Sequence, residues 1–163
     1  METVAQHLRA QALGRTAPLE QDQFARSSFN RSYYAAFLRV RDGLAVMSPK
    51  WDEMEHASMP QLLRGQITAA LKHGLTQARR NDDGELASTC SFALQAASQL
   101  ADLLDQGRMT RVIADYRPDH PVDFSTVPDF SLNAVTVKMA RSWRHRADLY
   151  MQTIEKAWGQ ISA

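Results

Sequence analysis

Apolar residues recur at steps of three and four along most of this chain, and that spacing limits the possible folds more than any other feature. The period is that of an amphipathic α-helix, whereas the β-branched runs and Asn-Gly turns typical of strands are almost absent. Proline and glycine interrupt the pattern and predict helices over residues 2–13, 19–47, 60–80, 85–116 and 131–160. Long helices with short connections favour an all-α fold, an antiparallel bundle of four to five helices in a single domain over residues 1–163.

The same spacing predicts which residues face the core. The second helix is expected to bury Phe29, Tyr33, Phe37, Val40 and Leu44, and the fourth Leu86, Cys90, Ala93, Ala97, Leu100 and Leu104. The fifth is expected to bury Val135, Met139, Trp143, Tyr150, Ile154 and Trp158. Pro118, Pro121 and Pro128 break the chain into a loop before this last helix.

Composition narrows the functional classes. Hydrophobic residues make up 44% and charged residues 23%, as in ordinary globular proteins, and no apolar run is long enough to span a membrane. The N-terminal residues do not read as a secretory signal, so we expect a cytoplasmic protein with no membrane partner. The net charge of +1 does not predict strong DNA binding. The single cysteine, Cys90, excludes an intramolecular disulfide and any site that needs several thiolates.

An arginine stands where the fourth helix should present an apolar residue. After Leu104 the inward positions fall at Gly107, Arg111 and Ala114. A buried guanidinium is unfavourable unless it is paired, and Asp115, four residues on, could pair with it. A phosphate ligand is a second explanation. A third is that Gly107 breaks the register, so that Arg111 faces water.

Two segments carry a resemblance to a known family. The second predicted helix contains Arg-x-Tyr-Tyr-Ala-x-Phe, formed by Arg31, Tyr33, Tyr34, Ala35 and Phe37. His56 follows in a loop, and the fourth predicted helix ends in Arg-x-x-Ala-Asp-Tyr, formed by Arg111, Ala114, Asp115 and Tyr116. The order and spacing of these elements over most of the chain resemble the HEPN superfamily (higher eukaryote and prokaryote nucleotide-binding domains).

This resemblance implies a homodimer in a bacterial cytoplasm that acts on RNA or a nucleotide, in some members beside a partner protein encoded nearby. Many members are metal-independent ribonucleases of toxin–antitoxin, CRISPR or anti-phage systems, and others bind without catalysis. The ribonuclease motif is arginine, four to six residues, then histidine. The arginine neutralises the scissile phosphate, and the histidine exchanges protons near neutral pH. No metal and no cofactor are implied.

The chain departs from this motif at the histidine. Tyr116 stands where the motif could first place it, and the nearest histidine, His120, lies beyond a proline. Tyrosine, with a pKa near 10, is a poor general base at neutral pH. A ribonuclease built on Arg111 would therefore need His120 or His56 to transfer the proton. Asp115 would orient Arg111, and we expect substrate contacts from Tyr116, Asp115, Tyr33, Tyr34 and Arg31.

Non-catalytic alternatives rest on the same residues. Arg111 and the tyrosines could bind a base and a phosphate without cleavage, and Tyr33 and Tyr34 could equally be core residues. The chain could be an interaction module in which Arg111, Asp115 and Tyr116 only pin the end of the bundle. A small-ligand-binding bundle would instead show an apolar pocket between helices.

Two further patterns are explained without a site of their own. The Glu-x-x-His at residues 53–56 would need a second copy for a di-iron site, and the sequence has none. The cluster Arg141-Ser-Trp-Arg-His145-Arg146 places Arg141 and His145 on one helix face, which we expect to be solvated and opposite Trp143. Near a nucleic-acid site, such a face would add phosphate contacts.

Overall fold

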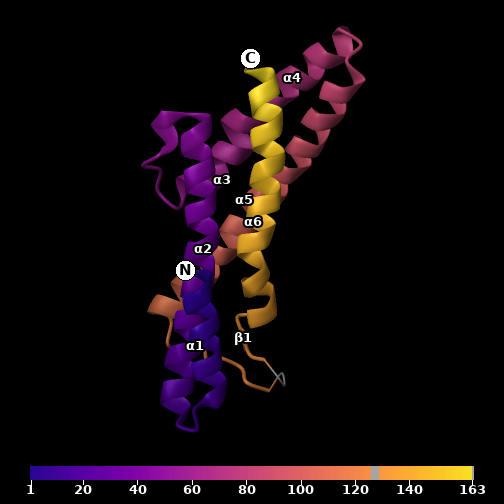
Figure 1. Cartoon of the computed structure of the whole chain (residues 1–163). Coiled ribbons are helices and arrows are strands. Elements are labelled where there is room, and N and C mark those ends of the chain that lie inside the picture. The colour runs from indigo at the N-terminus through magenta and orange to yellow at the C-terminus, as the bar shows by residue number, and fades with distance from the viewer. Residues whose placement is uncertain (126–128, 163) are drawn as a thin grey trace. The chain divides into compact units, whose positions relative to one another are not determined.

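The computed structural model describes residues 1–125 and 129–162, and its fold is all-α (Figure 1). Its long helices are α1 (Glu2–Gly14), α2 (Pro18–Met47), α4 (Thr68–Arg80), α5 (Gly84–Tyr116) and α6 (Val137–Ile161). The shorter elements are a 3₁₀ turn (Pro49–Trp51), α3 (Ser58–Leu62), a π-helical turn (Leu63–Ile67), β1 (Ser131–Leu132) and β2 (Val135–Thr136). The helical fold class predicted from the sequence is confirmed.

The predicted start of the last helix is wrong. Residues 131–136 form a small antiparallel hairpin, with Leu132 opposite Val135, and α6 begins at Val137. Asn133 and Ala134 make the turn with φ values of 48° and 63°, the left-handed pair that a two-residue hairpin requires. Ala134 is unusual at such a position, so the sequence lacks the Asn-Gly signal. Pro128, predicted to break the preceding loop, lies outside the described residues.

The third predicted helix is interrupted. Between α3 and α4 the backbone widens into the π-helical turn, and the hydroxyl of Thr68 donates to the carbonyl of Leu63 at 2.7 Å. The widened turn carries Arg64, whose guanidinium pairs with Asp102 and Asp105 of α5 at 2.6 Å each. A π-turn inserts an extra residue into a helix, and its sequence signature is too weak to predict.

The chain divides into two compact units. Unit 1 comprises Met1–Phe37 and Gln106–His145, and unit 2 comprises Leu38–Asp105 and Arg146–Ala163. The helical pattern predicted one domain and gave no indication of this division. The residues that carry the family resemblance fall mainly in unit 1, whereas His56 falls in unit 2.

The core of unit 1 is aromatic. Phe29, Tyr33, Phe130 and Trp143 are all 1% exposed or less, and Phe29 meets Phe130 edge-on with ring centroids 5.7 Å apart. Phe130 lies just before the hairpin, and its carbonyl accepts the Val137 amide at 2.9 Å. The hairpin therefore fixes the start of α6 on the core.

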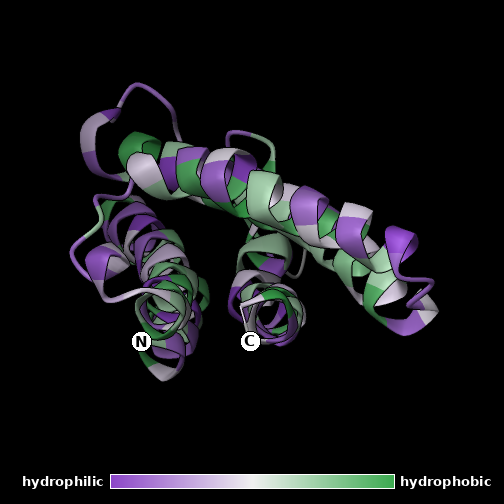
Figure 2. Ribbon diagram, turned by 90° about the horizontal axis from the view of Figure 1, so that it is seen from above, coloured by the Kyte–Doolittle hydropathy of each residue, from purple (hydrophilic) through white to green (hydrophobic). Residues whose placement is uncertain are grey.

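The core of unit 2 is mainly aliphatic. Its fully buried residues include Leu44, Met59, Leu63, Ile67, Leu71, Cys90, Leu100 and Ile154, and Trp51 meets Trp158 with ring centroids 5.5 Å apart. Burial raises the pKa of the Cys90 thiol, with a further contribution from Asp83, so this cysteine is a poor nucleophile. Hydrophobic and hydrophilic residues share each long helix, as expected of helices with one buried side (Figure 2).

The predicted seam of α2 is confirmed, because all five of its residues are at most 6% exposed. The predicted seam of α6 is partly wrong, since Met139 is 39% exposed. The buried stripe of α6 instead runs through Val137, Ala140, Trp143, Ala147, Met151, Ile154 and Ala157. Its alanines carry a weak apolar signal, which explains the error. Within the described ranges, no helix is long and apolar enough to cross a membrane.

Candidate functional site

Arg111 lies in unit 1, near the C-terminal end of α5. The helix continues through Gly107 to Tyr116, so the explanation in which Gly107 breaks the register is wrong. The side chain of Arg111 is 27% exposed, between the buried Gly107 and Ala114 on the same face. The guanidinium is thus half-buried at the edge of the core, where it needs a polar partner.

Asp115 is that partner. Nε of Arg111 lies 2.9 Å from Oδ2 of Asp115, but the N–H does not point at the oxygen, so the contact is an ion pair without a directed hydrogen bond. The other carboxylate oxygen of Asp115 accepts from Nδ2 of Asn30, on α2, at 2.7 Å. Asp115 therefore links the arginine of α5 to α2.

Two tyrosines flank the guanidinium. The ring centroids of Tyr34 and Tyr116 lie 5.9 and 5.7 Å from the Arg111 Cζ, within the range of a cation–π contact. Tyr116 is 65% exposed and Tyr34 is half-buried, so this Arg111 cluster (Arg111, Asp115, Tyr34 and Tyr116) opens to solvent on the side of Tyr116. An exposed ring beside an arginine offers a base both a stacking face and a cation.

Tyr33 does not belong to this cluster. It is 1% exposed and packs edge-on against Tyr34 with centroids 5.9 Å apart. Its ring also closes on Gly107, where an added Cβ would lie 2.7 Å from Cδ2 of the ring. The explanation of Tyr33 as a core residue therefore holds, and its ring packs beneath Tyr34.

The C-terminal end of α5 is held by a residue that the sequence analysis missed. Nη1 of Arg26, on α2, donates to the carbonyls of Ile113, Ala114 and Arg117 at 3.3, 3.5 and 3.3 Å. Nη2 donates to the carbonyl of His120 at 2.5 Å, and Nε pairs with Asp22 at 2.6 Å. The last carbonyls of a helix have no partner within the helix, and Arg26 donates to that of Ala114. The carbonyls of Ile113 and Arg117 also accept from the backbone N–H groups of Arg117 and His120. No sequence signal indicated the contacts of Arg26, because they join residues about 90 positions apart.

A hollow of about 520 Å³ lies beside the same helix end. It is lined by Leu8 of α1, by Gln23, Phe24, Arg26 and Ser27 of α2, and by Ala114 and Asp115 of α5. The guanidinium of Arg15 covers the Phe24 ring at 5.2 Å. Asp115 thus belongs both to the Arg111 cluster and to the wall of this hollow, which has the volume of a small-ligand site.

The predicted histidines differ in their positions. His120 lies in unit 1, its side chain is 41% exposed, and its Nε2 is 3.6 Å from Oδ2 of Asp119. The contacts of the Arg111 guanidinium are with Asp115, Tyr34 and Tyr116, so His120 is near the helix end without joining the cluster. His56 is half-buried in unit 2, and Arg31 is exposed on α2.

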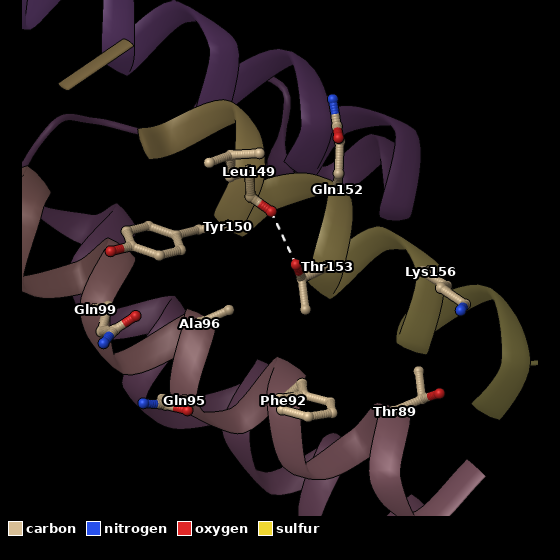
Figure 3. Close-up of a pocket in the computed structure, with 10 residues that line it drawn as sticks. All are labelled: Thr89, Phe92, Gln95, Ala96, Gln99, Leu149, Tyr150, Gln152, Thr153 and Lys156. Carbon is tan, nitrogen blue, oxygen red and sulfur yellow. Dashed lines mark hydrogen bonds between the residues drawn. The ribbon is translucent and has the colours of Figure 1, made fainter. Parts of the chain in front are cut away.

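A larger hollow lies in unit 2, between α5 and α6 (Figure 3). Its volume is about 570 Å³, and its walls carry the exposed Phe92 and Leu149 together with Gln95, Gln99, Gln152, Thr89 and Thr153. Lys156 is the one charged residue among the described residues that line it. These walls offer no acid–base pair, and the described part of the chain contains no group of His, Cys, Asp or Glu that could hold a metal ion.

No protein-family model matches the chain, and neither a curated protein nor a solved structure matches it. The HEPN resemblance therefore stays a prediction.

Proposed function

We propose that this chain is a HEPN-like protein that binds RNA at the Arg111 cluster. The observation that carries the proposal is the open side of the cluster, where Tyr116 is 65% exposed beside a guanidinium held by Asp115. A base stacks on the Tyr116 ring, and the Arg111 guanidinium, whose Cζ lies over the rings of Tyr34 and Tyr116, directs its free N–H groups at the phosphate. A cytoplasmic homodimer, acting with a partner protein, is the setting that goes with this proposal.

A purely structural role for Arg111 is less well supported, because Arg26 already fixes the helix end. Arg26 is 13% exposed and satisfies four carbonyls, whereas Arg111 makes an undirected ion pair with Asp115. An arginine needed only to hold two helices together would be expected to form directed hydrogen bonds. The residue that holds this helix end most extensively is therefore Arg26, which supports a ligand-binding role for the Arg111 cluster.

Ribonuclease activity without a metal is the second candidate, in a toxin–antitoxin or anti-phage setting. The observation that favours it is the bond from Arg26 to the carbonyl of His120, which holds the backbone of this histidine beside the helix end that bears Arg111. Rotation of the His120 side chain toward a phosphate bound by Arg111 would bring a proton-transfer group to it.

Binding is tested by fluorescence anisotropy with a labelled 15-nucleotide single-stranded RNA. We expect Tyr116→Ala to weaken binding by about 5- to 150-fold, the range that corresponds to the loss of one base stack. Phe92→Ala is the matched control, since it removes another exposed ring, 63% exposed, in unit 2. Equal affinity of the wild type and Tyr116→Ala, or no binding by the wild type, would contradict the proposal.

Cleavage is tested separately in EDTA, with total cellular RNA and a labelled tRNA pool. If the chain is a ribonuclease, the wild type should cleave these RNAs, and Arg111→Ala and His120→Ala should have lost the activity. His56→Ala distinguishes the two predicted histidines. If the proteins bind RNA but none of them cleaves it, the proposed RNA binding stands and ribonuclease activity on these substrates is excluded.

A further inference from the structure

The first part of α6 carries a basic face. Lys138, Arg141 and His145 are exposed and follow one another at steps of three and four, so they lie on one side of the helix. Val137, Ala140 and Trp143 are buried on the other side, each at most 1% exposed. The expectation that this cluster is solvated and opposite Trp143 is met, and its basic residues extend along about 10 Å of the helix axis.

Few acidic groups neutralise this face. The first acidic residue of α6 is Asp148, and within the described ranges no ion pair involves Lys138, Arg141 or His145. Glu2 of α1 lies in a shallow depression with Arg141 and Arg144 and is the one carboxylate among the described residues that line it. The face therefore keeps a positive charge, as phosphate-binding surfaces do.

Arg31 connects this face with the Arg111 cluster. The shallow depression is also lined by Ser32 and Ala35 of α2, so this part of α2 lies beside Arg141. Arg31 stands four residues before Ala35 and three before Tyr34, and residues at these spacings are neighbours on a helix surface. Tyr34 contacts Arg111. Exposed Arg31 thus lies between the arginine of α5 and the basic face of α6.

We infer that Arg31, Lys138, Arg141 and His145 contact the phosphate backbone of the RNA whose base stacks on Tyr116. We refer to these four residues as the backbone track. The inference rests on the proposed function and adds the surface that would bind the rest of the strand. Contacts to phosphates position a nucleic acid without reading its sequence, so the track predicts affinity that grows with strand length and falls with salt.

The test uses two single-stranded RNAs, of 3 and 15 nucleotides, titrated at several salt concentrations. Lys138→Ala/Arg141→Ala removes two charges from the backbone track. For single strands each phosphate contact contributes about 0.7 to the slope of log K against log salt, so we expect the slope for the 15-nucleotide RNA to fall by about 1.4. The same relation predicts roughly 25-fold weaker binding at 0.1 M salt, with less than about a two-fold change for the 3-nucleotide RNA.

Arg79→Ala/Arg80→Ala is the matched control, because it removes two exposed arginines from the end of α4 in unit 2. Circular dichroism melts verify that both double variants fold. An equal fall in slope in the control would overturn the inference, since net charge alone would explain it. An unchanged slope in Lys138→Ala/Arg141→Ala, with binding that still depends on Tyr116, would overturn the track and leave the proposed function. A wild type that binds neither RNA would overturn both.

Discussion

A Cβ atom added to Gly107 would lie 2.7 Å from Cδ2 of Tyr33, so glycine is the residue that allows this tyrosine to pack against α5. Tyr33 is 1% exposed, and its ring has little room to move. We expect Gly107→Ala to lower the free energy of unfolding by about 1–3 kcal/mol through overpacking, as measured by urea denaturation.

The control for this substitution is another helical glycine. Gly159, on α6, has no atom within 4 Å of an added Cβ, so Gly159→Ala should raise the free energy of unfolding by up to about 1 kcal/mol through helix propensity. Stabilisation by Gly107→Ala would show that Tyr33 yields easily and that the close approach is unimportant.

Arg26→Ala should be strongly destabilising. It removes a charged donor from the carbonyls of Ile113, Ala114, Arg117 and His120, although those of Ile113 and Arg117 keep a backbone donor. Hydrogen bonds from a charged group each contribute more than neutral ones. We expect a loss of about 2–3 kcal/mol in urea denaturation. Arg26→Lys should recover less than half of it, since one ammonium group cannot span the same acceptors.

Arg31→Ala is the matched control for Arg26 because it removes an exposed arginine from the same helix. Its effect on the free energy of unfolding should stay within about 0.5 kcal/mol. Similar effects of the two substitutions would contradict the capping role of Arg26.

Arg39 is expected to stabilise unit 2 through a pair of carboxylates on α6. Nε donates to Asp148 at 2.6 Å, and Nη1 and Nη2 donate to Glu155 at 2.9 and 3.1 Å. These bonds, that to Glu155 first, raise the pKa of Arg39. Arg39→Ala leaves two part-exposed carboxylates, so we expect a loss of about 1.5–3 kcal/mol, below the value for a fully buried pair.

Arg41→Ala provides the comparison for Arg39. Arg41 is 39% exposed and pairs with the 65% exposed Asp42, so screening by water makes the pair weak and the loss should be below about 0.5 kcal/mol. If thermal denaturation shows the same loss of stability for Arg39→Ala and Arg41→Ala, the ion pairs of Arg39 stabilise the fold no more than an exposed surface pair does.

The pKa of Asp119 should be measurably low. The hydrogen bond from Arg117 is the main reason that the pKa of this carboxyl falls to about 2. Because the folded-state pKa lies below the ordinary value of 3.8, ionised Asp119 favours the folded state above about pH 4, and this contribution is lost as the pH falls toward 2. Arg117→Ala should return the pKa toward 3.8 in an NMR titration of the carboxyl carbon.

Asp123 is the internal reference in that titration. The hydrogen bonds from Ser125 lower the pKa of Asp123, and they do not involve Arg117. The pKa of Asp123 should therefore stay low in Arg117→Ala. A shift of both carboxyls would indicate a rearranged loop in place of a lost local contact.

The helices were predictable because the apolar periodicity and the residues that typically end helices agree over long segments. Ser48 and Pro49 end α2 where expected, and the Asn-Asp-Asp-Gly turn separates α4 from α5. The hairpin before α6 was not predictable, because Ala134 takes a left-handed φ of 63° that its side chain does not favour. In such short segments, packing around Phe130 outweighs local preference.

Residue spacing predicted the site only where its partners are close in sequence, and Tyr34 was expected there only through the family resemblance. The spacing of Arg111 and Asp115 indicated their ion pair, and the same pattern placed Tyr116 beside them. The contact with Tyr34, the hydrogen bond from Asn30 and the cap by Arg26 all join α2 to α5. Contacts of this kind depend on how two helices meet, which the periodicity of either helix alone does not specify.

The distribution of tryptophans makes the division of the chain observable by fluorescence. Trp143 is fully buried in unit 1, whereas Trp51 and Trp158 lie against each other in unit 2. A protein in which both residues of the pair are replaced by phenylalanine therefore emits from unit 1 alone, and Trp143→Phe emits from unit 2 alone. The two signals make each unit its own reporter, so that a ligand bound at one can be told apart spectroscopically from a ligand bound at the other.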